Sequence, residues 1–240
     1  MSQARTLRGL PALRWAALAE IRRRPLATAL GIAIPLGTIL AIAVTDMLLD
    51  AGGELARVAM PVLLPVLLVT VTLGSLAAPV ADARERGVLR LLVTFPVHRG
   101  VLLLAHTPLA LAAAACVAAA GLAATRPPLA VMPGVLVACA GLCAIGMALG
   151  AAIGACAARA SQVRALSTIV PAVVLLTAGA LPFDAILPGA DRALGFVPTT
   201  AISRVLAETL AGGSPSLAPT LWIALAGVAL WGLGVARCRR

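Results

Sequence analysis

The sequence predicts an all-α integral membrane protein with six transmembrane helices. Three observations predict this class. Of 240 residues, 61% are hydrophobic and 12% are charged, whereas about a quarter of residues are charged in soluble domains. The mean hydropathy is +1.05. Uncharged runs also recur at the length of about 20 residues that a helix needs to cross the hydrocarbon core.

Six such runs lie along the chain. We predict membrane spans at about residues 26–45, 58–80, 100–123, 135–157, 165–181 and 217–236. The fourth span needs a preceding turn, since the 32 uncharged residues between Arg126 and Arg159 are too long for one upright helix. We expect that turn over the proline-rich residues 127–134.

The arginine distribution predicts the orientation. With the N-terminus inside, the cytoplasmic segments hold 15 of the 19 arginines, and the external segments hold six of the nine acidic residues. Cytoplasmic loops retain basic residues. We therefore predict a multi-pass protein of the inner (plasma) membrane with both termini in the cytoplasm.

The N-terminal residues 1–25 carry six arginines among apolar residues such as Leu7, Leu10 and Trp15. This pattern favours a helix lying in the cytoplasmic interface, with arginine heads reaching lipid phosphates. A merely basic topogenic tail is an equal alternative.

Composition also excludes several classes of function. The chain contains no lysine, so it has no phosphate-binding loop of the form G-x-x-x-x-G-K-[ST]. The few aromatic residues and the long uncharged runs argue against nucleic-acid binding. Cys139 and Cys143 are four residues apart without a nearby acidic or histidine partner in sequence. We predict buried thiols, no metal site, no disulfide and no catalytic residues.

A loop of mixed character follows the second predicted span. It runs over residues 82–99 and combines charged Glu85, Arg86 and Arg90 with an apolar stripe, and Pro96 would end a short helix there. The stripe consists of Val88, Leu89, Leu91, Leu92 and Phe95. This pattern is typical of an element that docks on a protein partner.

The motif E-R-G-x-L, followed by L-x-x-x-P-V directly after a second span, resembles the ABC-2 family of exporter permeases, nearest the drug and antibiotic-resistance branch. In that family the segment is a coupling helix that sits in a cleft of a separate ATPase. The resemblance gives this role to five residues: Glu85, Arg86, Gly87, Leu89 and Pro96. Val88 and Arg90 stand where the family usually has Thr and Glu.

The resemblance covers the whole chain and implies a single ABC-2 type transmembrane domain over residues 1–240, with a type V exporter-like fold. It implies a permease that is not itself an enzyme, has no cofactor of its own, and forms a dimer with a second copy or a homologue. ATP and Mg would be bound by the partner ATPase. The substrate would be a hydrophobic or amphipathic molecule, either a drug or antibiotic in efflux, or a lipid.

A short helix is expected before the last span. Thr199 would cap a helix over residues 200–210, whose apolar face consists of Ile202, Val205, Leu206 and Leu210. The family has re-entrant helices here, at a segment that resembles Phe196–Thr200. We therefore take Pro198 and Thr199 as a candidate exit gate.

Two features inside the spans remain. Gly146, Gly150 and Gly154 form a glycine ladder that favours close helix packing within the subunit over a dimer seam. His106 lies inside the third span, where an ionisable group suggests function. A hydrogen bond to a neighbouring helix is favoured over a proton relay.

Two other classes of function remain as alternatives. A proton-gradient-driven secondary transporter would need paired ionisable residues near the midplane. A membrane-embedded enzyme would need a catalytic cluster such as H-E-x-x-H.

Overall fold

The computed structural model describes residues 25–50, 52–88, 100–157, 160–180, 194–195, 197–213 and 218–237. Within these ranges the secondary structure is helical, in agreement with the predicted all-α class. The N-terminal residues 1–24, and with them the interfacial-helix prediction, lie outside the described part.

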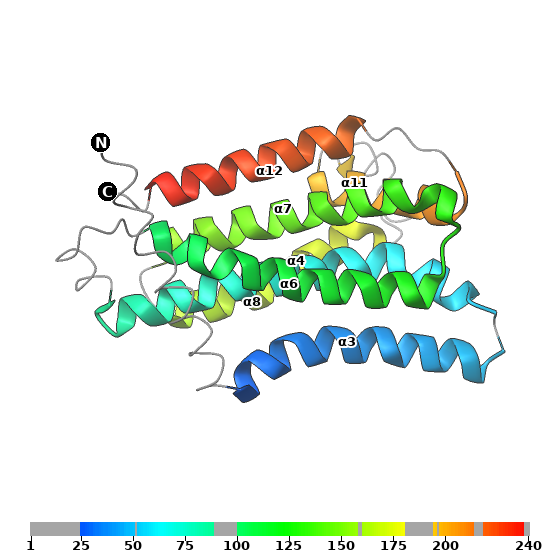
Figure 1. Ribbon diagram of the computed structural model, residues 1–240, viewed down its shortest axis with the longest axis horizontal. Coiled ribbons are helices and arrows are strands. Elements are labelled where there is room, and N and C mark those ends of the chain that lie inside the picture. Colours follow the sequence, from blue (N-terminus) through cyan, green and yellow to red (C-terminus); the bar gives the residue numbers. More distant parts are fainter. Residues whose placement is uncertain are drawn as a thin grey trace.

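Six long helices run alternately up and down the bundle (Figure 1). They are listed here in chain order: α3 (Pro25–Leu48), α4 (Glu54–Glu85), α6 (Gly100–Thr125), α7 (Met132–Cys156), α8 (Ala160–Leu175) and α12 (Ala218–Arg237). Three shorter elements complete the described fold: η1 (Leu129–Val131), η2 (Leu176–Ala180) and α11 (Pro198–Leu210). We refer to the two ends of the bundle as the Glu54 end and the Glu85 end, after the limits of α4.

Five of the described helices are long and apolar enough to cross a membrane. The apolar windows are Gly31–Leu48, Glu54–Glu85, Leu102–Thr125, Leu129–Gly154 and Ser161–Gly179. Helix α12 contributes a shorter apolar stretch, Thr220–Leu233. The described part of the chain is therefore that of an all-α membrane protein.

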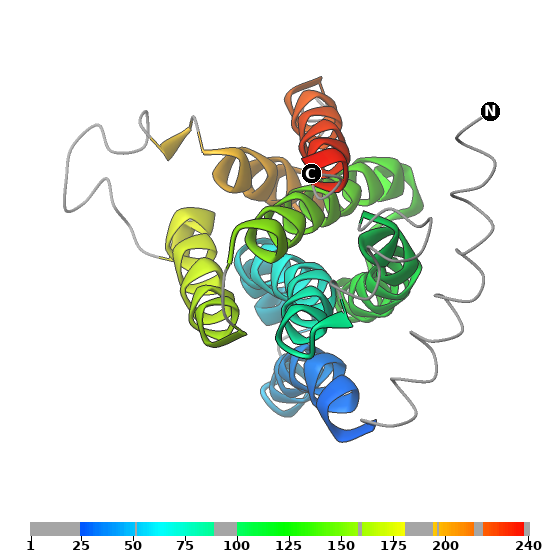
Figure 2. The same ribbon diagram turned by 90° about the vertical axis from the view of Figure 1, so that its left-hand side faces the viewer.

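Helices α4 and α7 form the centre of the bundle, and α3, α6, α8 and α12 surround them (Figure 2). In the apolar window of α4, 56% of the residues are buried inside the bundle, whereas 17% are buried in the window of α3. Large apolar side chains such as Met47 and Trp222 point outward from the peripheral helices. Extended apolar surface of this kind is rare on soluble monomers, so lipid is the natural neighbour of these faces.

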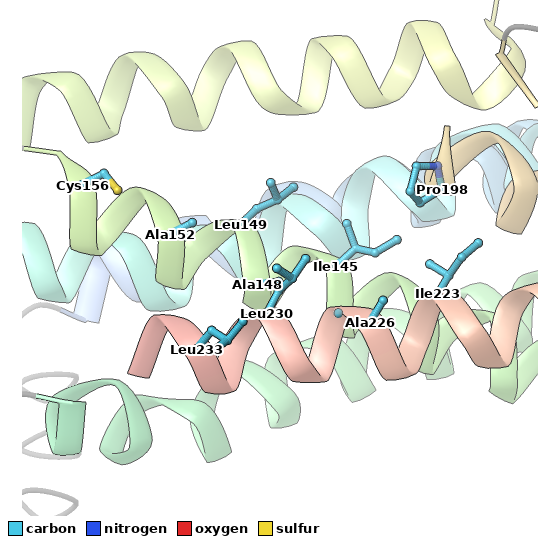
Figure 3. A pocket seen from close by; sticks show the side chains of 11 residues that line it. Ile145, Ala148, Leu149, Ala152, Cys156, Pro198, Ile223, Ala226, Leu230 and Leu233 are labelled. Carbon is cyan, nitrogen blue, oxygen red and sulfur yellow. The ribbon is translucent and has the colours of Figure 1, made fainter. Parts of the chain in front are cut away.

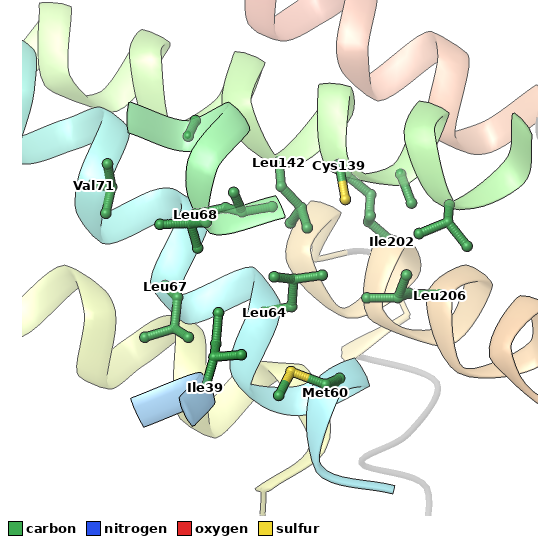
Figure 4. Packing of buried hydrophobic residues seen from close by; sticks show 14 of the residues in the cluster. Ile39, Met60, Leu64, Leu67, Leu68, Val71, Cys139, Leu142, Ile202 and Leu206 are labelled. Carbon is green, nitrogen blue, oxygen red and sulfur yellow. The ribbon is translucent and has the colours of Figure 1, made fainter. Parts of the chain in front are cut away.

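The largest core cluster joins α3, α4, α6, α7 and α11 near the Glu54 end (Figure 4). Leu64 and Leu68 of α4 meet Leu142 of α7 and Ile202 and Leu206 of α11 in this cluster, all almost completely buried. The short helix α11 therefore presents its predicted apolar face to the core.

Several predicted boundaries differ from the structure. Helix α4 extends to Glu85, five residues past the predicted end, and α8 begins at Ala160, five residues before the predicted start. Helix α7 begins at Met132 with Pro133 in its first turn, so the predicted turn is shorter than residues 127–134. Proline fits the first turn because the missing N–H has no partner there in any helix.

Candidate functional site

The first candidate site is the Glu85 end of α4. Asp82 and Glu85 belong to the last turn of this helix, and not to a separate short helix within the predicted 82–99 loop. Arg86 is the C-cap, and Gly87 follows with φ of 72°. A left-handed residue directly after a helix ends it and redirects the chain, and glycine adopts that conformation without a Cβ penalty.

Two arginines fix this end of α4. Arg86 pairs with the Asp82 carboxylate at 3.2 Å, one turn earlier. The Arg84 guanidinium donates to the carbonyl oxygen of Ala157, the C-cap residue of α7. This bond satisfies a carbonyl at the negative end of the α7 dipole with a cation, and it joins α4 to α7 at the Glu85 end.

Of the five predicted coupling residues, the structure describes three. Glu85, Arg86 and Gly87 lie together at the α4 terminus, with Arg86 and Gly87 in the turn. Leu89 and Pro96 lie outside the described residues.

The second candidate site is the start of α11, where the predicted exit gate lies. The N-cap is Val197, in an extended conformation and without a side-chain cap, and Pro198 is the first helical residue. The prediction that Thr199 caps this helix is therefore wrong. Thr199 lies inside the helix and is buried.

Threonines instead join the start of α11 to η2. The Thr199 and Thr177 hydroxyls lie 2.9 Å apart, and the Thr200 hydroxyl donates to the Thr177 carbonyl oxygen at 2.6 Å. That carbonyl is available because the chain leaves the regular helical path within η2, where Gly179 has φ of 98°. The start of α11 is thus fixed by hydrogen bonds to a different helix rather than by a cap of its own.

An apolar groove lies between α7 and α12 and reaches Pro198 (Figure 3). Its volume is about 630 Å³. Its walls are formed by Ile145, Leu149 and neighbouring residues of α7 and by Ile223, Leu230 and neighbouring residues of α12. Such a lining suits an aliphatic or aromatic molecule and offers little to an ion.

The glycine ladder of α7 faces α4 of the same chain. A Cβ at Gly150 would lie 3.0 Å from the Leu73 carbonyl oxygen, and one at Gly154 would lie 3.3 Å from Val80 Cβ. At Gly146 it would overlap the Thr72 hydroxyl. The ladder therefore brings the two central helices together within one subunit.

His106 is buried in α6, and its Nδ1 lies 2.9 Å from the Leu102 carbonyl oxygen. That partner belongs to the same helix, one turn earlier, so the predicted hydrogen bond to a neighbouring helix is not the one observed at Nδ1.

Cys116, Cys139, Cys143 and Cys156 are free thiols.

Asp46 is a structural residue that sequence reasoning missed. Its carboxylate in α3 accepts hydrogen bonds from the backbone N–H groups of Gly53 at 2.7 Å and Leu55 at 2.9 Å. These groups lie at the start of α4, whose N-cap glycine has no side chain of its own. The pair Gly52-Gly53 before Glu54 was the available signal, since it marks a helix start that another residue must cap.

Comparison of the chain with family models, with curated proteins and with solved structures finds no match.

Proposed function

We propose that this chain is the transmembrane permease subunit of an ATP-driven exporter. It would move a hydrophobic or amphipathic molecule, a drug or antibiotic or a lipid, out of the cell. A separate ATPase would bind ATP and Mg, and a second permease copy or homologue would complete the transport path. Helix α12 would be the sixth span, with both termini in the cytoplasm of the inner (plasma) membrane.

The observation that carries this proposal is the length and anchoring of α4. Its 32 residues correspond to about 48 Å at 1.5 Å per residue, compared with about 30 Å of hydrocarbon. An upright α4 therefore crosses the membrane and projects from it. Force applied at the Gly87 turn would reach the other end through one continuous helix.

The packing of α4 supports a role in transmitting that force. Residues Leu64 and Leu68 of this helix belong to the same core cluster as Ile202 and Leu206 of α11. At its other end, Arg84 joins α4 to α7. A movement of the Glu85 end would therefore act on α7 directly and on the start of α11, where we propose the exit gate.

The apolar groove between α7 and α12 supports a hydrophobic substrate. Its lining residues are apolar apart from the weakly polar Cys156 thiol. A molecule that partitions into the membrane would reach such a surface sideways from the lipid. Drug efflux and lipid export share this requirement.

The alternative, a proton-gradient-driven transporter, has less support. The Nδ1 atom of His106 is engaged with the carbonyl of Leu102 in its own helix. Threonine hydroxyls in α4 and α6 make the same kind of bond to the preceding turn. This arrangement satisfies a polar side chain within an apolar helix and needs no proton transfer.

The test is co-purification of the chain with candidate ATPases encoded beside it. We expect Glu85→Arg and Leu89→Asp to abolish the complex and ATP-dependent transport in reconstituted vesicles. The matched control is Arg126→Glu, an exposed charge reversal at the Glu54 end of the bundle, which should leave the complex intact. Transport by the lone chain on a proton gradient, or equal loss of the complex in the control, would contradict the proposal.

A further inference from the structure

A second groove lies at the Glu54 end of the bundle, separate from the apolar groove between α7 and α12. Its volume is about 520 Å³, which is within the size range of small-molecule sites. One wall is formed by the first turns of α4 and the other by α11, with Ala178 of η2 between them. Unlike the first groove, it contains charged side chains.

The charges of this second groove come from two elements. Arg57 and Glu54 lie on α4, and Arg204 lies on α11. Two arginines and one glutamate leave one net positive charge. Glu54 pairs with Arg57 at 3.4 Å, and both side chains are exposed. Exposed pairs one turn apart are weak, so an anionic ligand can replace Glu54 as the partner of Arg57.

The apolar part of the groove continues from the charged part along α4. Val58 and Val62 line it on this helix, and Leu210 lines it on α11. Val62 lies five residues after Arg57, which is about 7.5 Å along the helix axis. This distance is comparable to the thickness of one polar headgroup layer, which is about 5–7 Å. The groove therefore joins cationic side chains to apolar ones, among which Val58 is exposed and Val62 is partly buried.

The hydroxyl group that lines the groove already donates a hydrogen bond within the protein. Ser203 lines the α11 wall, and its hydroxyl donates to the Thr199 carbonyl oxygen at 2.8 Å. The guanidinium groups of Arg57 and Arg204 are the cationic donors that line the groove. Their planar arrangement of donors matches phosphate and carboxylate oxygens.

We infer that this groove binds an anionic amphiphile. Its phosphate or carboxylate head is held by Arg57 and Arg204, and its alkyl chain lies against Val58 and Val62. The inference deepens the proposed function by naming the charge of one class of exported molecule, and it depends on that function for the groove facing the outside of the cell. Binding itself requires neither ATP nor the ATPase.

The experiment measures equilibrium binding of dodecyl phosphate to the full chain in phosphatidylcholine nanodiscs, with empty nanodiscs as background. Arg57→Gln and Arg204→Gln should each weaken binding about tenfold, as expected for loss of one charge-assisted contact. The control Arg126→Gln removes an exposed arginine at the same end of the bundle but outside the groove. It should bind as the unmodified chain does.

A comparison of three ligands tests the inference on the unmodified chain. Dodecyl phosphate should bind at least about tenfold more tightly than dodecanol or dodecyltrimethylammonium. Equal binding of the three, or equal loss in the Arg126 control, would overturn the inference. Competition by inorganic phosphate at the same concentration would also overturn it, because the alkyl chain would then contribute nothing.

A further arm distinguishes the sources of the amphiphile. Phosphatidylglycerol nanodiscs should suppress dodecyl phosphate binding if the site accepts a membrane lipid, and should leave it unchanged if the site takes a smaller amphiphile. Either result supports an anionic amphiphile when the charge selectivity holds. Failure of selectivity while the ATPase complex stays intact would reject this inference and leave the proposed function standing.

Discussion

At the scale of single residues, Asp46 shows how a carboxylate can stabilise a helix other than its own. It lies near the end of α3, and its two oxygens accept from the N–H groups of Gly53 and Leu55 at the start of α4. A negative charge is favourable at this positive end of the helix dipole. Asp46 therefore fixes the angle at which the chain enters the longest helix of the bundle.

We predict that Asp46→Asn destabilises the protein by about 1–2 kcal/mol, because an amide supplies one acceptor oxygen and no charge where the carboxylate supplies two oxygens. The measurement is the unfolding midpoint in mixed micelles. Asp50→Asn makes the same chemical change at an exposed position in the same connection and should alter stability by less than about 0.5 kcal/mol. Equal effects of the two substitutions would show that the hydrogen bonds of Asp46 to the start of α4 do not add to the stability of the protein.

Thr199 illustrates the limit of reasoning from local sequence. Threonine before a helical pattern is a common N-cap, yet this residue lies inside α11 and contacts Thr177. The local pattern was compatible with two starting points two residues apart, Pro198 and Thr200. The hydrogen bonds to η2 join residues more than 20 positions apart, so the local sequence carries no signal for them.

At the scale of elements, the contact between α4 and α7 depends on residues without side chains. Gly150 approaches the backbone of Leu73, and Gly146 approaches both Thr72 and the Cα of Val69, which a Cβ would meet at 3.1 Å. Backbone atoms cannot move aside as the end of a flexible side chain can. The spacing of these two helices is therefore set by the glycine ladder.

We predict that Gly146→Ala destabilises the protein by about 1–3 kcal/mol, the range for overpacking a tight contact. Gly74→Ala, on the facing helix α4, places its Cβ in open space. It should be neutral or stabilising by up to about 1 kcal/mol, because alanine favours the helix over glycine. Opposite signs in the two unfolding midpoints are the expected result. Equal destabilisation by both substitutions would mean that the effect comes from backbone conformation and not from the tight contact of Gly146 with α4.

The helix ends show which contacts decide a boundary. Helix α4 continues through Asp82, Arg84 and Glu85 although the apolar run ends near Val80. Polar residues are compatible with a helix that leaves the lipid, and the bond from Arg84 to Ala157 stabilises this last turn from outside it. The left-handed Gly87 then ends the helix. The change from apolar to charged residues therefore does not mark the end of this helix.

At the scale of the whole molecule, the two ends of the bundle should lie on opposite sides of the membrane. Leu129 in η1 is highly exposed at the Glu54 end, and Arg86 is partly exposed at the Glu85 end. We predict that, in a variant lacking the five native cysteines, Leu129→Cys reacts with a membrane-impermeant maleimide in right-side-out vesicles. Arg86→Cys should react only after the vesicles are opened, because arginine-rich segments are retained in the cytoplasm.

The control is labelling of each variant in detergent, where both positions should react. Reaction of Arg86→Cys in sealed vesicles would place the Glu85 end outside. That result would separate the Glu85 end from cytoplasmic ATP and contradict its proposed coupling role.

The sequence by itself determined the class of the protein and the approximate course of the long helices, because the bilayer demands about 20 apolar residues per span and each demand is met within one continuous segment. It also indicated the apolar face of α11 and the glycines of α7. The tertiary structure alone decided the partners. Arg84 meets Ala157, Thr200 meets Thr177, and the charged groove between α4 and α11 forms from residues about 150 positions apart. Such contacts depend on how helices pack against one another, and packing combines segments whose spacing along the chain carries no periodic signal.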